Sequence, residues 1–243
     1  MIDLHCHILP GIDDGSGSLE ESLAMAAMAA DQGIRHMVAT PHCITGSVRE
    51  VMSNVTMLQE LLREEHIPLQ LYPGMEIFGT CDTARLLTEG KLLTLNDSRY
   101  PLIEFDFHAD GEEQTRVLRA VIAAGYTPLV AHPERYSCVC YEPEWANLWW
   151  EMGCLFQVNR GSLLGRYGQQ ARQMGMELVR RGFATVVATD AHSPVVRTPR
   201  AGDVYELLSR EVSPIAAETL MQHNPGRILK DTLLPPAEPD WFE

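Results

Sequence analysis

Short apolar runs recur along the 243-residue chain and alternate with segments of helical periodicity. Several of these runs are continuously apolar rather than alternating, which is typical of parallel strands covered on both faces. The runs that we predict to be strands are Ile2–Leu4, His36–Ala39, Leu69–Tyr72, Pro101–Ile103, Pro128–Ala131, Leu155–Val158 and Thr185–Ala188. We therefore expect seven strands, each of which contributes apolar side chains to the core.

The clearest predicted helix begins after Ser18, where Ser-Leu-Glu-Glu forms a capping box with Glu21. Its apolar residues share one face, and Gly33 ends it. Further helices are predicted at residues 48–65, 112–124, 142–152, 168–181 and 199–210. Strands that alternate with helices at this spacing predict an α/β protein with a parallel sheet, either doubly wound or closed into a barrel. No linker or repeat interrupts the pattern, so we expect one domain at residues 1–234 and a C-terminal tail at 235–243.

The composition of the chain argues against some classes of binding partner and indicates a cellular compartment. The chain has 19 basic and 33 acidic side chains, a net charge of -14, which argues against binding to nucleic acid. It contains no apolar run of the roughly 18 residues that a membrane span needs, and its first residues, MIDLHCHILPG, lack the basic and apolar regions of a signal peptide. Its 6 cysteines are few for this length. We therefore expect a cytoplasmic protein with reduced thiols and no membrane insertion.

Residues of the types that bind metals follow every predicted strand. They are His5, His7, His42, Glu76, Glu104, His132, Asn159, Asp190 and His192. The C-terminal ends of parallel strands form one face, so these side chains should lie together. A pair such as His5-x-His7 alone is also explained by two hydrogen-bonded core histidines, but buried carboxylates without partners are too costly to gather by accident. We therefore predict a metal site.

The segments DLHCHILPGIDDGS, TPH, GMEI, LNDSRYPLIEF, HPERY, QVN, TDAH and NPGRIL together resemble the PHP (polymerase and histidinol phosphatase) superfamily, in order from residue 1 to about residue 231. The first and fourth segments resemble its bacterial manganese-dependent protein-tyrosine phosphatases of capsular and exopolysaccharide synthesis. The resemblance implies a distorted seven-stranded (β/α)7 barrel. It also implies a phosphotyrosine protein as substrate, namely the C-terminal tail of a bacterial tyrosine autokinase, and it leaves a homo-oligomer open.

The same resemblance implies up to three divalent ions, Mn²⁺ with Fe or Zn as alternatives, and two arginines that bind the substrate phosphate. The implied ligand sets are His5, His7, Glu76 and Asp190 for one ion; Glu76, Glu104 and His132 for a second; and His42, His192 and Asp14 for a third, with Asp13 as the alternative to Asp14. The implied phosphate ligands are Arg135 and Arg197. Metals and arginines together would make the pocket cationic in spite of the acidic chain. A metal-activated hydroxide would attack phosphorus in line, and the general acid stays open between His42 and a metal-bound water.

Three other interpretations remain. Residues 42–49, HCITGSVR, fit the H-C-x-x-G-x-x-R phosphate loop of cysteine-based phosphatases, with Cys43 as nucleophile and Arg49 on the phosphate. Glu50 stands where a hydroxyl residue usually follows, and the motif leaves the ligand-type residues unexplained. A PHP-type phosphatase for histidinol phosphate or a sugar phosphate would use the same site. A metal-binding scaffold without activity is disfavoured because no ligand is missing.

Overall fold

Two parallel sheets form the centre of the protein in a computed structural model that describes residues 1–42 and 48–243. One sheet has the order β1-β2-β3 and the other the order β4-β5-β6-β7-β8. The strands are β1 (Ile2–Cys6), β2 (His36–Ala39), β3 (Gln70–Pro73), β4 (Glu76–Phe78), β5 (Leu102–Glu104), β6 (Leu129–Ala131), β7 (Leu155–Asn159) and β8 (Ala184–Ala188). The predicted α/β class with parallel strands is confirmed.

Hydrogen bonds link the two sheets at both of their seams. Cys6 bridges to Ala191 beyond β8, and His42 bridges to Glu76 at the start of β4. Most of the strands are buried on both faces, as their continuous apolar sequences predict, and β6 and β8 are buried throughout. One buried cluster contains Leu4, Val38, Leu102, Leu129 and Val186, which come from strands of both sheets. A common apolar interior therefore holds the two sheets together, and their strand ends face one side.

The prediction of seven strands is wrong, because the described chain has eight. The extra strand is β4, which follows β3 after only Gly74 and Met75. β3 pairs with β2, whereas β4 pairs with β5 in the other sheet. A Cβ atom at Gly74 would lie 2.7 Å from Cγ1 of Val38, so the chain can pass this close to β2 only with glycine. The apolar pattern runs through this step without a break, and it therefore could not reveal the change of sheet.

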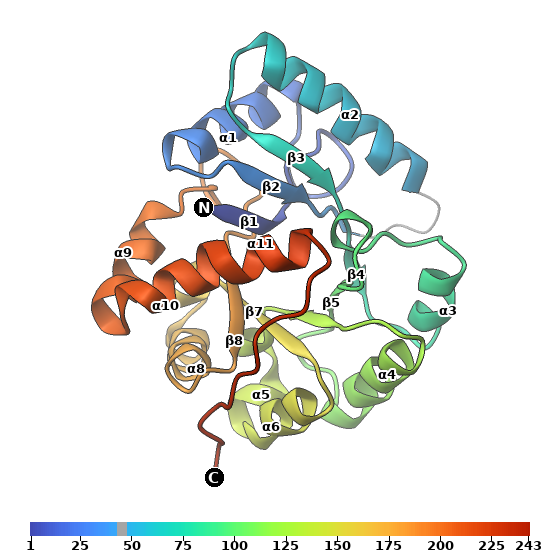
Figure 1. The fold of residues 1–243 in the computed structure, drawn as a ribbon, viewed down its shortest axis with the longest axis vertical. Coiled ribbons are helices and arrows are strands. Elements are labelled where there is room, and N and C mark those ends of the chain that lie inside the picture. Colours follow the sequence, from blue (N-terminus) through green and yellow to red (C-terminus); the bar gives the residue numbers. More distant parts are fainter. Residues whose placement is uncertain (43–47) are drawn as a thin grey trace.

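Helices surround the strands (Figure 1). They are α1 (Leu19–Asp31), α2 (Val48–Glu64), α3 (Thr83–Thr88), α4 (Gly111–Ala123), α5 (Ser137–Tyr141), α6 (Glu144–Glu151), α7 (Arg160–Leu163), α8 (Gln169–Arg180), α9 (Gly202–Glu211), α10 (Pro214–Glu218) and α11 (Asn224–Leu229), with a π-helical turn η3 (Thr219–His223) and the 3-10 turns η1 (Leu95–Asp97) and η2 (Pro133–Arg135). All six predicted helices are present. α3, α5, α7, α10 and α11 were not predicted, because helices of 4 to 6 residues show too little periodicity.

The predicted signals at the ends of α1 are confirmed in detail. The hydroxyl of Ser18 accepts a hydrogen bond from the backbone N–H of Glu21 at 3.3 Å. The carboxylate of Glu21 accepts one from the backbone of Gly17 at 2.9 Å, one residue before the position that the capping box predicts. Gly33 adopts φ 84°, the left-handed conformation that ends a helix.

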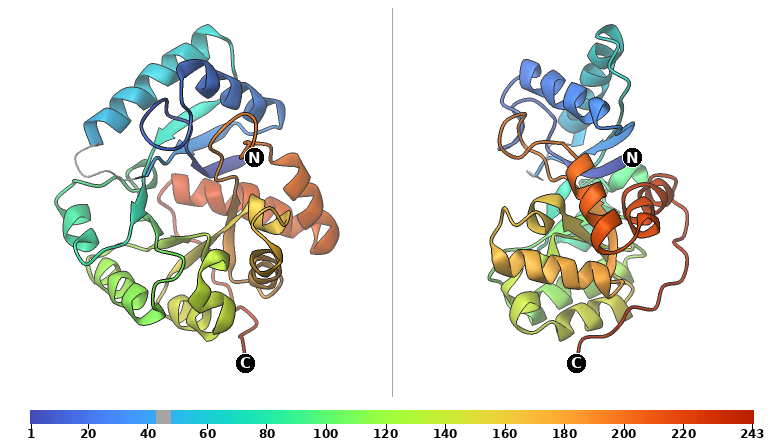
Figure 2. Two further views of the ribbon diagram at one scale, coloured as in Figure 1. Left: turned by 180° about the vertical axis from the view of Figure 1, so that it is seen from behind. Right: turned by 90° about the vertical axis from the view of Figure 1, so that its left-hand side faces the viewer.

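The C-terminal tail packs against the domain at its far end. The ring of Phe242 lies 5.2 Å from that of Phe183, and the side chain of Asn147 bonds to the backbone of Phe242. Figure 2 shows this segment running along one side of the molecule. Among the described helices, none is both long enough and apolar enough to cross a membrane.

Candidate metal centre

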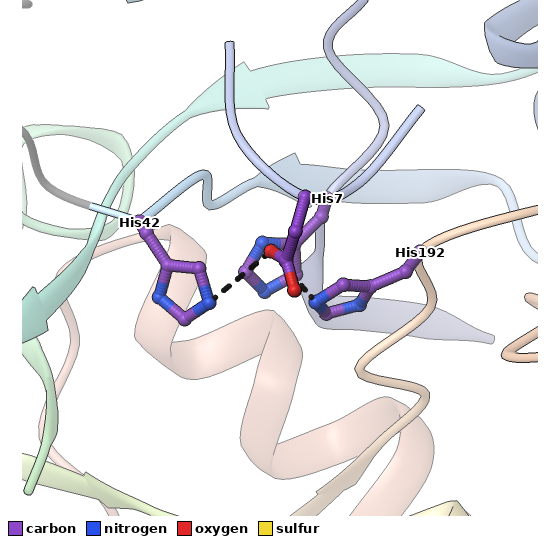
Figure 3. Close-up of side chains that lie close together, drawn as sticks. His7, His42 and His192 are labelled. Carbon is purple, nitrogen blue, oxygen red and sulfur yellow. Dashed lines mark ion pairs between the residues drawn. The ribbon is translucent and has the colours of Figure 1, made fainter. Parts of the chain in front are cut away.

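The side chains predicted as metal ligands come together on one side of the strands. His5 lies in β1, Glu104 ends β5 and Glu76 opens β4, three residues beyond the end of β3. The remaining positions lie in the segments after strands: His7 and Asp14 after β1, His42 after β2, His132 after β6, and Asp190 and His192 after β8. Figure 3 shows the rings of His7, His42 and His192 gathered at one point. The break between β3 and β4 is what brings Glu76 to the middle of this group.

The deep part of the cluster consists of His5, His7, Glu76 and Asp190, all of them buried. The Nε2 atoms of His5 and His7 lie 3.2 Å apart. The Oε2 atom of Glu76 lies 3.2 Å from the first and 3.1 Å from the second. The Oδ1 atom of Asp190 lies 3.5 and 3.6 Å from the same two nitrogens. Four potential ligand atoms therefore surround one point.

Hydrogen bonds on the far side of both imidazoles determine which nitrogen faces this point. Nδ1 of His5 lies 2.8 Å from Oε1 of Gln157, and Nδ1 of His7 lies 2.7 Å from the carboxylate of Asp13. Both partners are acceptors, so each Nδ1 carries the hydrogen and each neutral ring presents an Nε2 lone pair. Two lone pairs thus face each other and the carboxylates of Glu76 and Asp190. Only a cation, whether a metal ion or protons, makes this arrangement favourable.

Glu76 also joins the deep part to its neighbours. Its Oε1 atom lies 2.8 Å from Nε2 of His132, and its Oε2 atom lies 3.2 Å from Nδ1 of His42. The same nitrogen of His42 lies 2.8 Å from Oε1 of Glu104. Glu104 lies farther from His132, at 4.0 Å. The single carboxylate of Glu76 is therefore placed to bridge two cations.

The outer part of the cluster is formed by Asp14 with two imidazoles. Its Oδ1 atom lies 3.5 Å from Nε2 of His42 and 3.4 Å from Nε2 of His192. Nε2 of His192 is buried and has no hydrogen-bond partner in the part of the chain that the structure describes. The neighbouring Asp13 is committed elsewhere: besides His7, its carboxylate accepts hydrogen bonds from the backbone of His42 and of Gly15. Geometry therefore separates the two adjacent aspartates, which the sequence alone could not do.

Among the described residues, three groups of side chains could each hold one ion, with their ligand atoms within 4.8 Å of one another. These groups are His5, His7 and Asp190; His42, Glu76 and Glu104; and His7, Asp14, His42 and His192. They overlap the predicted sets but are not identical to them. His7 and His42 each enter two groups, whereas His132 enters none. Within residues 1–42 and 48–243, the buried Nδ1 atom of His132 has no hydrogen-bond partner.

Electrostatics of the cluster follow from burial and opposing charges. Burial disfavours the protonated form of His5, but the charges of Glu76 and Asp190 outweigh it and raise the pKa of this imidazole to about 10. Burial opposes protonation of His42 too, yet the hydrogen bond to Glu104 and the charge of Glu76 raise its pKa to about 9. For His192, burial and the nearby His7 lower the pKa to about 3. Where no metal is bound, protons on the imidazoles therefore compensate the charge of the carboxylates. Metal binding must release these protons.

Asp190 is also the point at which both predicted phosphate-binding arginines meet the cluster. Its Oδ2 atom lies 2.6 Å from Arg197 and 3.9 Å from Arg135, and it accepts a hydrogen bond of 2.5 Å from the side chain of Asn159. Burial raises the pKa of Asp190, but His5 and Arg197 together lower it to about 2. The guanidinium groups thus flank the metal-ligand cluster rather than pointing to bulk solvent.

Aromatic rings hold Arg135 in place. Its guanidinium carbon lies 4.2 Å from the ring centre of Phe107 and 4.3 Å from that of Tyr167, and Tyr167 is 6.0 Å from the guanidinium of Arg197. The positions of these two rings beside Arg135 and the role of Gln157 were not predicted from the sequence. The i, i+2 spacing of Gln157 and Asn159 on one strand could have indicated that both face the cluster. No sequence signal distinguishes Tyr167, which lies in the loop after α7.

Only part of the competing cysteine motif, residues 42–49, lies within the described residues. Cys43 lies outside the described residues, so its position relative to the cluster stays untested. Arg49 lies in the first turn of α2, where its side chain is exposed. Among the described residues, no carboxylate lies within ion-pair distance of Arg49, and its guanidinium takes no part in the cluster.

The fold and the site together define a class of α/β proteins with a metal-ligand cluster where parallel strands end. The chain belongs to the family described as "Capsular polysaccharide synthesis, CpsB/CapC", which matches residues 1–230. It is 36% identical over 215 residues to the tyrosine-protein phosphatase YwqE of Bacillus subtilis, a match that covers 87% of this chain and 85% of YwqE. It is 31% identical over 243 residues to the tyrosine-protein phosphatase CpsB of Streptococcus pneumoniae, covering 96% and 100% of the two chains.

Solved structures agree with this assignment. A structure from work on YwqE and CpsB, described there as unique metal-dependent tyrosine phosphatases, superposes with a TM-score of 0.93 at 33% identity over the full length of both chains. The lactonase Lmo2620 of Listeria monocytogenes superposes with a TM-score of 0.59 at 13% identity over 94% of each chain. The second match shows a shared fold alone.

Proposed function

We propose that this chain is a metal-dependent protein-tyrosine phosphatase that hydrolyses phosphotyrosine monoesters. One observation carries the proposal: the Nε2 lone pairs of His5 and His7 face each other at 3.2 Å beside the buried carboxylate of Glu76. Such a group needs a cation to be stable. The relatives named tyrosine-protein phosphatases supply the substrate class.

Three divalent ions fit the donor atoms. We assign His5, His7, Glu76 and Asp190 to one ion, Glu76, Glu104 and His132 to a second, and His42, His192 and Asp14 to a third. Mixed imidazole and carboxylate ligands suit Mn²⁺, with Fe or Zn as alternatives, better than Ca²⁺. When bound, such ions act as Lewis acids and lower the pKa of water from ~15.7 toward ~7.

The substrate phosphate would be bound by Arg135 and Arg197. Both guanidinium groups are only partly exposed and lie at the edge of the cluster, next to Asp190. Guanidinium groups form paired, charge-assisted hydrogen bonds with phosphate oxygens. Phe107 and Tyr167 restrict Arg135 from both sides, so little side-chain entropy is lost when phosphate binds. The two arginines would thereby stabilise negative charge on the oxygens during displacement.

A cavity beside these arginines supports an aromatic leaving group. It has a volume of about 420 Å³ and is lined by Arg160, Gly161, Arg166, Tyr167, Thr189, Val196 and Arg197. The ring of Tyr167 forms part of its wall, where a tyrosyl ring and its peptide neighbours can pack. The phenol of tyrosine has a pKa near ~10, so it needs less help from a general acid than an alkyl alcohol does. The donor of that proton stays open between His42 and a metal-bound water, because the raised pKa of His42 belongs to the cluster without metal.

The biological setting follows from the family name. We infer that the substrate is the C-terminal tail of a bacterial tyrosine autokinase and that the protein acts in the cytoplasm in control of capsular or exopolysaccharide synthesis. We also infer that residues 1–234 are one PHP-type domain and that 235–243 are its tail. A homo-oligomer remains compatible with this arrangement.

Chelation tests the proposal. Treatment with a chelator should abolish hydrolysis of p-nitrophenyl phosphate, and Mn²⁺ should restore it better than Fe²⁺, Zn²⁺ or Ca²⁺. Circular dichroism should show that the chelated protein keeps its fold, so that lost activity reports lost metal. Full activity in a preparation free of metal by elemental analysis would overturn the proposal.

A small-molecule phosphatase is the second candidate, because the same cluster can act on any monoester that reaches it. Comparison of kcat/KM for a phosphotyrosine peptide, the matching phosphoserine peptide and histidinol phosphate separates the two. We expect the phosphotyrosine peptide to be the best substrate by at least ~10-fold, because its ring is bonded directly to the ester oxygen and can pack against Tyr167. Phosphoserine has no ring, and the imidazole of histidinol phosphate is three carbons away from its ester oxygen. Equal or better turnover of histidinol phosphate would favour the second candidate.

A further inference from the structure

A second cavity lies on the side of the strands away from the metal cluster. Its volume is about 770 Å³, and it is lined by Ile2, His36, Tyr72, Asn96, Gln222, His223, Gly226, Arg227, Leu229, Lys230 and Thr232. Ile2 and His36 begin β1 and β2, whereas His5 and His42 lie at or beyond the other ends of these strands. Figure 1 is viewed from the side on which α11 crosses the strands, and Figure 2 (left) shows the opposite side. Small-molecule sites typically measure ~300–1,000 Å³.

The charge of this cavity is opposite to that of the chain. None of its lining residues is acidic, although acidic side chains outnumber basic ones by 33 to 19 in the whole chain. Within the described residues, no carboxylate lies within 4.0 Å of Arg227 or Lys230. Asp231, the acid next to Lys230 in the sequence, is paired with Arg99 at 2.9 Å instead. Two cations thus line one cavity without a counter-charge.

Helix electrostatics alone do not explain this arrangement. Cations near the C-terminal end of α11 are favourable, which accounts for the presence of Arg227 and Lys230. This helix effect does not account for the cavity between the two cations and the strands. It also does not account for the lack of acidic side chains around the cavity. The guanidinium of Arg227 donates to the carbonyl of Leu233 at 3.1 Å, which keeps it at the cavity.

The rest of the wall suits the organic part of a ligand. The hydroxyl of Tyr72 lies 3.0 Å from Nδ1 of His36, so these two rings form a fixed polar and aromatic surface. Burial lowers the pKa of His36, and the charges of the N-terminal ammonium group and of Lys230 add to this effect. Ile2 and Leu229 supply apolar contacts beside it.

We propose that this cavity binds a phosphorylated small molecule of about nucleotide size. Arg227 and Lys230 hold its phosphate oxygens, as paired guanidinium and ammonium groups do in other phosphate sites. The flat or apolar part of the ligand lies against Tyr72 and Ile2. The site is separate from the metal centre and does not depend on the proposed phosphatase activity.

Lysine labelling tests the proposal, because Lys230 and Lys91 are the only lysines of the sequence. The metal-loaded enzyme is incubated briefly with pyridoxal phosphate, the imine is reduced with borohydride, and both lysines are quantified by peptide mass spectrometry. Lys91 is exposed and paired with Glu89 at 2.6 Å, away from the cavity, and serves as the internal control. We expect at least ~10-fold more label on Lys230 than on Lys91, with pyridoxal, which has no phosphate, showing a much smaller preference.

Protection and substitution complete the test. ADP should protect Lys230 from labelling, whereas adenosine should not. Arg227→Gln should lower the labelling of Lys230 at least ~10-fold. It should leave hydrolysis of p-nitrophenyl phosphate unchanged, which also shows that the variant is folded. Equal labelling of both lysines by pyridoxal phosphate, protection by adenosine as good as that by ADP, or undiminished labelling in the Arg227→Gln variant would each overturn the proposal.

Discussion

The metal-ligand cluster has a deep part and an outer part, which differ in burial and in how their side chains are held. The deep side chains, His5, His7, Glu76 and Asp190, are at most 2% exposed. In the outer part, by contrast, the side chain of Asp14 is 65% exposed and that of His42 is 35% exposed, although His192 beside them is buried. Both parts contain imidazole and carboxylate groups, so chemical type alone does not distinguish them.

Their supports explain the difference. Three of the four deep side chains have a further partner outside the cluster: Gln157 for His5, Asp13 for His7, and Asn159 for Asp190. The fourth, Glu76, is held by the imidazoles of the cluster itself. Such partners fix ring orientation and tautomer before an ion arrives. Asp14 lies in the loop after β1, and its carboxylate has no hydrogen-bond partner among the described residues. We infer that the deep position is preorganised and binds its ion tightly, whereas the outer position binds its ion weakly and exchanges it.

Glu76→Gln should have the largest effect. Glu76 contacts His5, His7, His42 and His132. Loss of its charge leaves the deep imidazoles with Asp190, whose carboxylate lies farther away, as their shared anion. Activity should fall on the order of 10³-fold or more, and the purified variant should retain less metal than wild type by elemental analysis. A variant with full metal content and near-normal activity would remove the basis for treating the deep part as the centre of the site.

Arg135→Ala should have the next largest effect while leaving both parts of the cluster intact. We expect kcat/KM to fall by ~10²-fold, because a charge-assisted donor to the substrate phosphate is lost. Metal content and melting temperature should stay close to wild type. Arg85→Ala is a matched control, because Arg85 forms only exposed ion pairs with Asp82 and Glu89. Loss of metal or unfolding in Arg135→Ala would show that the arginine is structural.

Asp14→Asn probes the outer part directly. Activity at low Mn²⁺ should fall by ~10-fold, in the range seen when one contributor to a metal site is weakened, and excess Mn²⁺ should restore most of it. The activity of Glu76→Gln, in contrast, should not recover with added Mn²⁺. Activity of both variants over a Mn²⁺ titration measures the difference. Equal response of the two variants to Mn²⁺ would contradict the division into a tight and a weak position.

Cys43→Ser should have the smallest effect. If the metal cluster performs the chemistry, the variant keeps at least about a third of its activity, whereas loss of a true nucleophile costs several powers of ten. His42→Ala is the informative neighbour, since His42 contacts Glu76, Glu104 and Asp14 and should be far more damaging. An inactive Cys43→Ser protein that is folded and fully metallated would establish the cysteine mechanism instead.

The sequence by itself determined the features that depend on neighbours along the chain. The capping box at Ser18 and the left-handed Gly33 predict α1, because both act within one helical turn. Residues such as His5, His132 and Asp190 could be selected as ligands because each follows a predicted strand, and parallel strands must end on one side. The α/β class and the family resemblance rest on the same local patterns.

Only the tertiary structure decided the features that depend on contacts between distant segments. The passage from β3 to β4 at Gly74 depends on the close approach of Val38, which the apolar pattern does not encode. The two adjacent aspartates, Asp13 and Asp14, acquire different roles because His7 reaches only the first and His192 only the second. Stacking of Tyr167 on Arg135 joins loops that are far apart in sequence. Periodicity and short motifs report local backbone preference and burial, whereas these roles depend on which side chains the folded chain brings within contact distance.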